Sequence, residues 1–399
     1  MSRFFKTYIK FGSFFLWLKP HLGQRLIVSA ILAALIIIAD YFIGNLSYPI
    51  FDSSSDLGLQ AYLHDFKDNE DDFFAVNTAF DKSLAVAIDE YGDSCGYIPV
   101  TDRQLLTKFL NVADKSDYKY IFLDIRFDRQ FSTPFDSVLF RKISNMPRIA
   151  FSRHRGDKDE LEDSEVISKG SFSDFRTTRT NGFSRYEFLQ DGQKSVALKM
   201  YEDIDCKSIF PTWWGGYRDN DGWICRNMQF VPFPKKILSE YDSDDMDAIR
   251  YPLMGSQHLG KHTEEELIRM MNGKVILIGD FNNDMHDTYI GEVPGPLLSY
   301  YAWRVLQLGN HRVNLWLQLF LFIFYTVSIN LILRQPDKAI KANPLVVMAL
   351  SLLGWSAALW VLKSIIYWIF GLSFLVIIPS IIFSAITTLK EFHLYYTQK

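Results

Sequence analysis

Cysteine is scarce in this sequence, since only Cys95, Cys206 and Cys225 occur among 399 residues. None of them belongs to a C-x-x-C pair, which argues against a cysteine-based zinc cluster, and three thiols cannot all pair within one chain. A disulfide between Cys206 and Cys225 stays open if the region lies in an oxidising compartment. An excess of positive charge is lacking too: the net charge is -4 and no basic stripe occurs, so we expect no nucleic-acid partner.

Several standard catalytic motifs are also missing. The sequence has no H-E-x-x-H zinc motif, no P-loop and no glycine-rich dinucleotide turn, so metalloprotease, phosphoryl-transfer and hydride-transfer mechanisms lack their usual parts. We therefore expect neither an enzyme nor a cofactor, and the pattern leaves metal binding undecided. A hydrolase that works with carboxylates alone stays open as an alternative.

Long hydrophobic runs are what the sequence does have, and they lie at its two ends. About 20 apolar residues cross a bilayer as a helix, so we expect four transmembrane helices, with a retained first anchor rather than a cleaved signal peptide. The expected spans are 26–46, 313–333, 345–362 and 365–389. The last two are separated by Lys363 and Ser364, which predicts a tight helical hairpin. Asp40 in the first span either reaches the outer headgroups or pairs with Lys363.

Basic residues indicate the direction of these helices. They gather before the first span and between the second and third spans, and such segments are cytoplasmic by the positive-inside rule. The charges are Arg3, Lys6, Lys10, Lys19, Arg25, Arg334, Lys338 and Lys341. The cytoplasmic segments are then the amphipathic N-terminal segment 1–25, the loop 334–344 and the tail 390–399. Residues 47–312 face outward, which in a bacterium means an inner-membrane protein with a periplasmic domain.

Within residues 47–312, short apolar runs alternate with amphipathic helical patterns. This alternation predicts an α/β domain with a mostly parallel sheet. The expected strands are Leu84–Ile88, Tyr120–Leu123, Arg148–Phe151 and Val275–Ile278. Amphipathic helices are expected after the first, second and fourth of these runs, with Thr101 or Asp102 as the cap of the first helix and Gly309 at the end of the last. The pattern breaks down over 152–274, which we interpret as an insertion.

Acidic residues follow the expected strands, at the sheet edge where ligands usually bind in open α/β folds. The candidate ligand-binding acids are Asp89, Asp124, Asp128, Asp280, Asp284 and Asp287, with His286 nearby. Converging carboxylates suit a divalent cation or a cationic ligand. The alternative is that these acids only accept hydrogen bonds in turns. Trp213 and Trp214, set among glycines, form either a stacking platform for a ligand, a hydrophobic plug or a contact with the membrane surface.

Two blocks resemble a known sensory family, the second type of CHASE domain, which lies outside the membrane in bacterial cyclases and kinases. The first block has a strand ending in Asp89, a Gly96-x-x-Pro99 step, Arg103 on the next helix and a second strand reading Asp-Ile-x-Phe. The second has a strand ending in Ile-Gly, an Asp-containing loop, then Pro-Gly and a helix. The resemblance covers nearly the whole chain, but the Trp-rich insert and the Pro-Leu-Leu-Ser after Pro-Gly depart from it.

This resemblance implies a sensor or accessory protein that binds a ligand or protein in the periplasm. The family usually carries a cytoplasmic output domain, whereas only residues 390–399 follow the last expected span, so we expect signalling through a separate protein partner. A homo-oligomer stays open. The alternative function is a non-catalytic structural or assembly component of an envelope complex. A transporter ranks third, because the spans contain hardly any charge.

Overall fold

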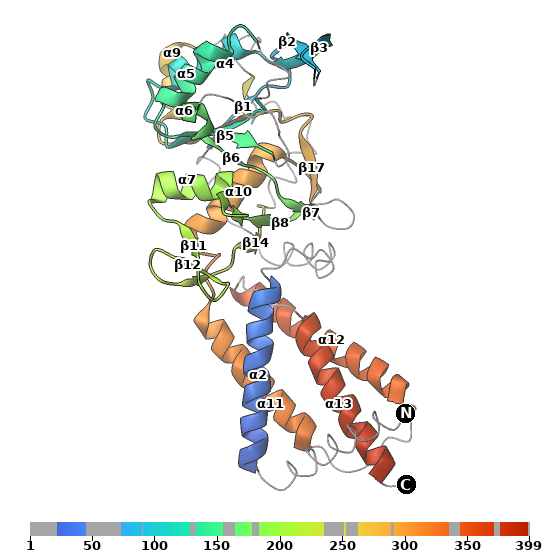
Figure 1. Ribbon diagram of the computed structural model, residues 1–399. Coiled ribbons are helices and arrows are strands. Elements are labelled where there is room, and N and C mark those ends of the chain that lie inside the picture. The colour runs from blue at the N-terminus through green and yellow to red at the C-terminus, as the bar shows by residue number, and fades with distance from the viewer. Residues whose placement is uncertain are drawn as a thin grey trace. The chain divides into compact units, whose positions relative to one another are not determined.

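The computed structural model describes residues 22–44, 73–89, 91–127, 133–154, 164–177, 183–234, 251–252, 262–288, 291–334, 344–370 and 376–397. The chain divides into two compact units. One unit comprises residues 1–51 and 313–399, and its described part is helical (Figure 1). The other unit comprises residues 52–312 and contains every described strand.

Three helices of the first unit are long and apolar enough to cross a membrane, over Gly23–Ile43, Leu315–Arg334 and Val346–Ile366. The four helices of this unit are α2 (Leu22–Gly44), α11 (Leu315–Arg334), α12 (Pro344–Phe370) and α13 (Ile377–Thr397). The expected turn at Lys363 and Ser364 is wrong, because α12 continues through both residues. One lysine in a long apolar segment does not end a helix. The count of four spans is not confirmed, because α13 is not among these three helices.

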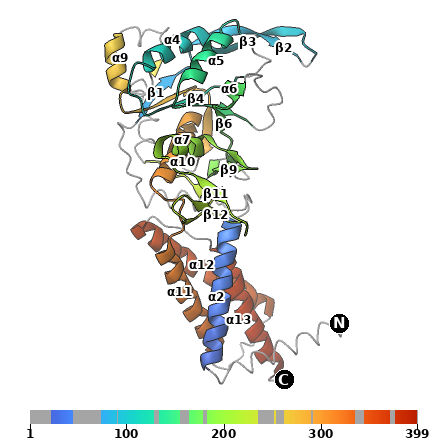
Figure 2. The ribbon, with the colours of Figure 1, turned by 60° about the vertical axis from the view of Figure 1, so that its left-hand side comes forward.

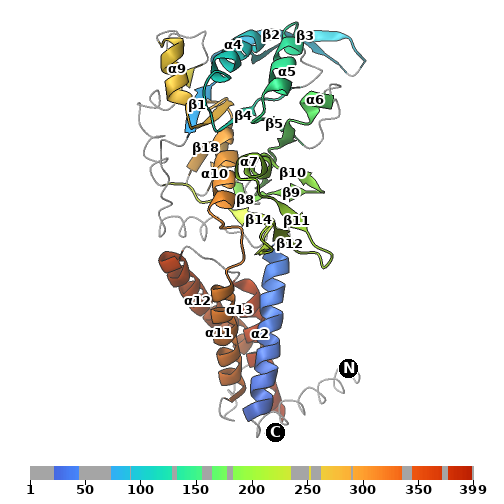
Figure 3. The same cartoon turned by 90° about the vertical axis from the view of Figure 1, so that its left-hand side faces the viewer.

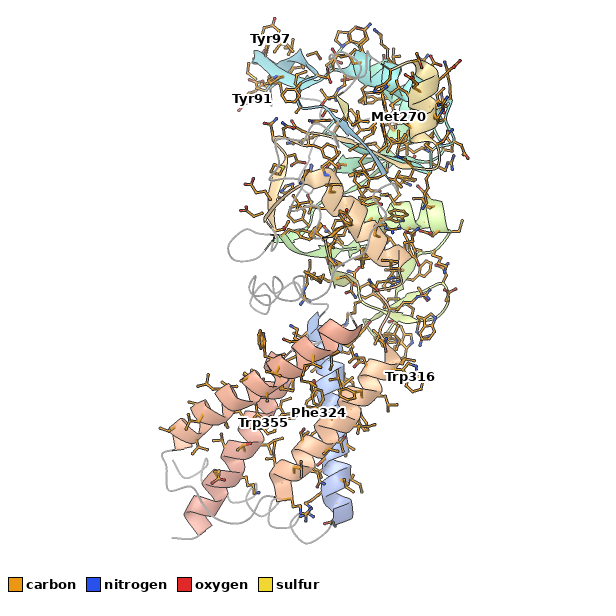
Figure 4. The ribbon with its side chains drawn as sticks, turned by 180° about the vertical axis from the view of Figure 1, so that it is seen from behind. Tyr91, Tyr97, Met270, Trp316, Phe324 and Trp355 are labelled. Atoms are coloured by element: carbon orange, nitrogen blue, oxygen red, sulfur yellow. The ribbon has the colours of Figure 1, made fainter. Side chains whose placement is uncertain are left out.

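Small and apolar side chains hold this helical unit together. On α2, Ala33 and Ile36 are fully buried in one apolar cluster with Tyr325 of α11, and Figure 4 shows Phe324 on α11 and Trp355 on α12. The polar residues Asp40 and Lys363 are both buried as well. The Lys390 ammonium donates a hydrogen bond to the Ile332 carbonyl at 2.8 Å, which satisfies an acceptor in the last turn of α11.

A six-stranded sheet forms the centre of the second unit, and all of its pairs are parallel. The strand order is β15-β1-β16-β4-β5-β6. The strands are β1 (Phe73–Asn77), β4 (Tyr120–Asp124), β5 (Ile149–Arg153), β6 (Gly170–Phe172), β15 (Tyr251–Pro252) and β16 (Val275–Gly279). The predicted mostly parallel sheet is therefore confirmed.

Helices cover both faces of this sheet, which explains why its central strand β16 is buried at every position. On β16, Ile276 and Ile278 face the cluster that includes α4 and α9, whereas Val275 and Leu277 face the cluster that includes α7 and α10. Figures 1 and 3 show α4, α5 and α9 on one side and α7 and α10 on the other. These helices are α4 (Arg103–Ala113), α5 (Asp136–Asn145), α7 (Val196–Asp205), α9 (Glu264–Met271) and α10 (Gly295–Gln307).

Two expected helix ends are confirmed at the level of single residues. The Asp102 carboxylate accepts hydrogen bonds from the backbone N–H groups of Gln104 and Leu105, each at 2.9 Å, and so caps α4. Gly309 adopts a positive φ of 74° just after α10. A residue with a Cβ avoids this conformation, so glycine suits the end of that helix.

The run Leu84–Ile88 was wrongly predicted to be a strand of the parallel sheet. It belongs to β2 (Lys82–Ile88), which pairs with β3 (Ser94–Thr101) in an antiparallel hairpin. Leu84 and Val86 are exposed while Ala85 and Ala87 are buried, the alternation of a strand covered on one face. The first strand of the central sheet is instead β1, which the sequence analysis missed.

The hairpin also bears on the expectation that the chain is not an enzyme. Residues 92–96 read Gly-Asp-Ser-Cys-Gly, which matches the G-x-S-x-G pattern of a hydrolase nucleophile, so the expectation that this motif is absent is wrong. That motif needs a sharp turn from a strand into a helix. Here Gly92 lies in a β-turn and Ser94 begins β3, so the match lacks its structural context.

The region 152–274, interpreted as an insertion, contributes to the main fold as well as to small sheets. It supplies β6, β15, α7, α9 and the short helix α6 (Ser164–Ile167). Its small antiparallel sheets include the three-stranded one of β11, β12 and β13, visible in part in Figure 2. The other strands of this region are β7 (Arg176–Thr177), β8 (Phe183–Glu187), β9 (Leu189–Gln190), β10 (Gln193–Lys194), β11 (Ile209–Pro211), β12 (Tyr217–Asp219), β13 (Ile224–Cys225) and β14 (Met228–Phe230). Two further strands, β17 (Met285–Thr288) and β18 (Gly291–Pro294), lie after this region and pair with each other.

Candidate functional site

Asp124 is the last residue of β4 and lies at the carboxyl edge of the central sheet. Its backbone pairs in register with Gly279 of β16, where a Cβ would lie 3.0 Å from the Cβ of Asp124. On the other side, the buried Ser152 hydroxyl of β5 donates a short hydrogen bond to the Asp124 carboxylate. Two neighbouring strands therefore fix this carboxylate, which keeps part of its surface accessible.

A second carboxylate, that of Asp284, meets Asp124 at the N-terminus of α10. The Gly295 N–H donates to the Asp284 carbonyl oxygen at 2.9 Å. A Cβ on Gly295 would collide with Oδ2 of Asp284 and would lie 3.0 Å from Oδ2 of Asp124. Glycine is thus required for the close approach of both carboxylates to the helix. The partial positive charge of a helix N-terminus favours anionic groups there.

Histidines border this pair of carboxylates on two sides. The Nε2 atom of His286 lies 3.0 Å from Oδ1 of Asp284, and the His286 ring packs edge-on against Phe175 with centroids 4.8 Å apart. The Nδ1 atom of His154, just after β5, lies 2.9 Å from Oδ1 of Asp174. Both imidazoles therefore belong to the polar surroundings of the carboxylate pair.

The environment raises the pKa of Asp124 to about 6. Burial is the main cause and the negative charge of Asp284 is the second, while the Ser152 hydroxyl and the two histidines, His154 and His286, oppose the shift. Asp124 therefore binds its proton far more tightly than an ordinary aspartate. A cation placed between the carboxylates would favour the ionised form and release that proton.

Asp280 has a structural role in the same loop. Its carboxylate accepts hydrogen bonds from the backbone N–H groups of Asn282 and Asn283, and it lies 3.3 Å from the Lys82 ammonium. Burial alone would raise the pKa of Asp280, but these donors and Lys82 outweigh it and lower the pKa. The buried Asn77 at the end of β1 also holds the loop, since its side chain accepts from the Phe281 N–H at 3.1 Å.

Two other candidate acids, Asp89 and Asp287, do not join this cluster, and a third lies outside the described residues. Asp89 lies in the turn of the β2–β3 hairpin, where its carboxylate accepts from the N–H groups of Tyr91 and Asp93. It was expected at the sheet edge, and it has a turn role because its strand is not part of that sheet. Asp287 is an exposed residue of β17. Asp128 lies outside the described residues.

The aromatic and cysteine candidates lie on the small β11–β12–β13 sheet or next to it. Trp213 is 96% exposed in the turn after β11, whereas the Trp214 ring folds over Gly216, so the two indoles do not form one platform at the sheet edge. Cys206 and Cys225 are not joined in a disulfide. Cys206 is exposed after α7 and Cys225 is buried in β13, and the disulfide that the sequence left open is not formed.

Sequence reasoning named Asp124, Asp284 and His286 but missed three partners in the site, Ser152, His154 and Gly295. Ser152 and His154 follow the apolar run at Ile149, the position where the end of a parallel strand meets the sheet edge. Their position at the end of an expected strand was therefore the signal that could have identified Ser152 and His154 as site residues.

The chain was compared with protein-family models, with curated proteins and with solved structures. No match was found in any of the three comparisons. The family that the chain belongs to is therefore not shown, and the resemblance to the CHASE sensory domain stays a hypothesis that rests on the motifs quoted above.

Proposed function

We propose that this chain is a receptor of the bacterial inner membrane that works by binding rather than by catalysis. Its α/β domain lies in the periplasm and binds a positively charged ligand, either a divalent cation or a protonated amine, between Asp124 and Asp284. The bound state is passed to a separate protein partner. The CHASE-like motifs and the apolar helices at both ends of the domain support this proposal.

The observation that carries the proposal is the convergence of two carboxylates at Gly295. Both Oδ2 atoms lie against this one residue, and the negative charge of Asp284 contributes to the raised pKa of Asp124. Carboxylates that repel one another bind a cation well, because the cation removes the repulsion. The site also lies at the carboxyl edge of a parallel sheet, the usual ligand position in such folds.

The connection of α10 to the membrane helices suggests how binding is transmitted. This helix begins at Gly295 in the site and ends at Gln307, a length of about 20 Å. Only residues 308–314 separate it from α11. If the α10 N-terminus has two positions and the ligand binds one of them more tightly, binding favours that position. The change would then reach the segment that enters α11.

The basic residues before 26 and between 334 and 344 support the proposed orientation, with four spans and residues 47–312 outside. Reporter fusions within 47–312 test it directly. We expect periplasmic reporters to be active there and cytoplasmic reporters to be silent. The opposite pattern would refute the receptor interpretation.

Ligand binding is tested on the full chain in detergent, after treatment with a chelator. Thermal unfolding is followed with Ca²⁺, Mg²⁺ or spermidine added separately. We expect at least one of these probes to stabilise the wild type and to lose its effect in Asp124→Asn and Asp284→Asn. Asp287→Asn is the matched control, because Asp287 is exposed and stands outside the carboxylate pair.

Two results of the binding experiment would contradict the proposal. Equal stabilisation of the wild type and of both site variants would place the binding elsewhere. Turnover of phosphoesters or glycans that disappears in Asp124→Asn would support the carboxylate hydrolase instead. The same purified protein serves for both measurements.

A second candidate function, an assembly component of an envelope complex, is favoured by the β2–β3 hairpin. Leu84 pairs with Pro99 and Val86 with Tyr97, and these four residues are exposed on one face. Figure 4 shows Tyr91 and Tyr97 on this hairpin, and they are 84% and 71% exposed. An apolar face of this kind is typical of a protein contact.

Co-purification distinguishes the two functions. For an assembly component, envelope proteins should be recovered with the wild type and lost in a Leu84→Ser, Tyr97→Ser double variant, while Asp124→Asn leaves them unchanged. For a receptor, the partner should be a signalling protein, and its recovery should respond to the cation.

A further inference from the structure

A second cluster of ligating side chains lies in the α/β unit, separate from the carboxylate site. Asp219 ends β12, Cys225 ends β13 and His311 follows α10, and all three are buried. One oxygen, the sulfur and one imidazole nitrogen all lie within 4.8 Å of one another. Asp219 and Cys225 are close in sequence, but His311 comes from a distant part of the chain.

Backbone contacts hold the cluster in place. The β12–β13 turn contains Gly222 at a positive φ of 81°, and the Asp219 carboxylate accepts from the Trp223 N–H at 2.8 Å. The Arg226 N–H donates to the His311 carbonyl at 2.8 Å. The position of His311 beside the hairpin is therefore set by the main chain and does not depend on its side chain.

The side chain of His311 supplies an independent sign that a ligand is missing. It is 0% exposed, and neither ring nitrogen has a hydrogen-bond partner. The Val305 carbonyl favours protonation of the ring without reaching hydrogen-bond geometry, and Tyr201 offers only its ring, with centroids 5.7 Å apart. Buried polar groups are nearly always satisfied, so two unpartnered nitrogens on one buried ring need an explanation.

We propose that Asp219, Cys225 and His311 bind one Zn²⁺ ion, with water as the fourth ligand. Zinc in proteins takes sulfur, imidazole nitrogen and carboxylate oxygen in tetrahedral sites, whereas Ca²⁺ and Mg²⁺ prefer oxygen alone. The Cys225 thiol loses its proton to solvent as the sulfur–zinc bond forms, and Asp219 and His311 bind without a change of charge.

Arg312 and its partners are compatible with an ion at this place. The Arg312 guanidinium pairs with Asp219 at 2.7 Å and also with Asp221, which has Lys207 on its exposed side. A carboxylate has about four lone-pair sites on its two oxygens, so Asp219 can accept from Trp223, pair with Arg312 and bind a metal together. The positive charges of Zn²⁺ and Arg312 are then balanced by the negative charges of Asp219, Asp221 and a Cys225 thiolate.

Bound zinc would connect the β12–β13 hairpin to the segment between α10 and α11. His311 precedes the first residue of α11, Leu315, by only three intervening residues. The metal would therefore stabilise the place where the chain leaves the α/β unit. Zinc would act there as a structural clamp, and this role does not depend on the carboxylate site.

The test uses the full chain in detergent with Cys95→Ser and Cys206→Ser, which leaves Cys225 as the single thiol. The chelator-treated protein is loaded with Zn²⁺ or Co²⁺ and desalted. We expect one equivalent of Zn²⁺ and a thiolate-to-cobalt charge-transfer band. Cys225→Ser and His311→Gln should lose the band and the bound metal. His262→Gln is the matched control and should keep both, because His262 lies beside Glu266 of α9, outside this cluster and outside the carboxylate pair.

Folded protein without a charge-transfer band overturns the proposal, as does an amount of bound Zn²⁺ that is the same in both cluster variants as in the parent protein. The parent protein alone decides the question if the variants do not fold, because its single thiol reports contact with cobalt. Thermal unfolding gives a second measurement, since Zn²⁺ should stabilise the parent protein more than it stabilises Cys225→Ser, whereas the response to Mg²⁺ should be the same in both proteins.

Discussion

Neutralising Asp124 should make the protein more stable at alkaline pH. The raised pKa means that the folded domain disfavours the ionised carboxylate, chiefly because of burial and next because of Asp284. This cost is absent below about pH 4, where Asp124 is protonated in the folded and unfolded states alike, and is present in full above about pH 7. Asp124→Asn removes the charge but keeps an oxygen that accepts from Ser152.

The size of the effect follows from the shift. A rise from 3.8 to about 6 corresponds to about 3 kcal/mol between the two charge states. Solvent reaches part of the side chain and screens it, so we expect the variant to gain ~2 kcal/mol at high pH. In a domain of this size that gain raises the melting temperature by ~4–8 °C.

The assay is thermal unfolding of the full chain in detergent, with a chelator present and over a pH series from about 4 to about 8. The gain of Asp124→Asn over the wild type should grow as the pH rises through the folded pKa. Asp287→Asn, at an exposed position, should show no such trend.

A variant that is less stable than the wild type at about pH 8 would refute this reasoning. A difference that stays constant over the whole series would refute it too, because it would show that the ionisation of Asp124 is not what the fold opposes.

Two further substitutions test the surroundings of the site by chemical denaturation. Asn77→Ala removes hydrogen bonds to Ala79, Phe281 and Asn282, so the free energy of unfolding should fall by ~2–3 kcal/mol, and an unchanged midpoint would contradict this role. Arg103→Ala removes a buried guanidinium and leaves the partly exposed Asp136, 3.3 Å away, without a charge partner, so we expect a loss of ~2 kcal/mol, and a loss below ~0.5 kcal/mol would show that the pair contributes little.

The parts of the fold that sequence predicts are those with one strong local signal. Val275–Ile278 and Tyr120–Leu123 are continuous apolar runs, because helices cover the sheet on both sides. Leu84–Ile88 is also a continuous apolar run, but its residues are alternately exposed and buried, which only the structure shows. The run was therefore assigned to the wrong sheet. The run at Phe73 follows a stretch of acids and gave a weak signal.

The carboxylate site was predictable in part, and the metal cluster was not. Asp124 and Asp284 follow strands or lie in the loop after one, and the rule for parallel sheets places such residues together. His154 stands in a charge-rich segment that looks like a solvated loop. Cys225 and His311 are far apart in the sequence and match no metal-binding motif, so only the folded structure brings them together.

The burial of α10 restricts how the α/β unit can change shape. Eleven of its thirteen residues are buried, and Tyr300 and Trp303 are among the largest fully enclosed side chains. Interiors packed to this density do not let one helix slide or turn past fixed neighbours, since each such step would open voids and create overlaps. A shift at Gly295 must therefore carry the adjoining layer with it, so α10 acts as a stiff rod set in the domain and not as a piston moving through it.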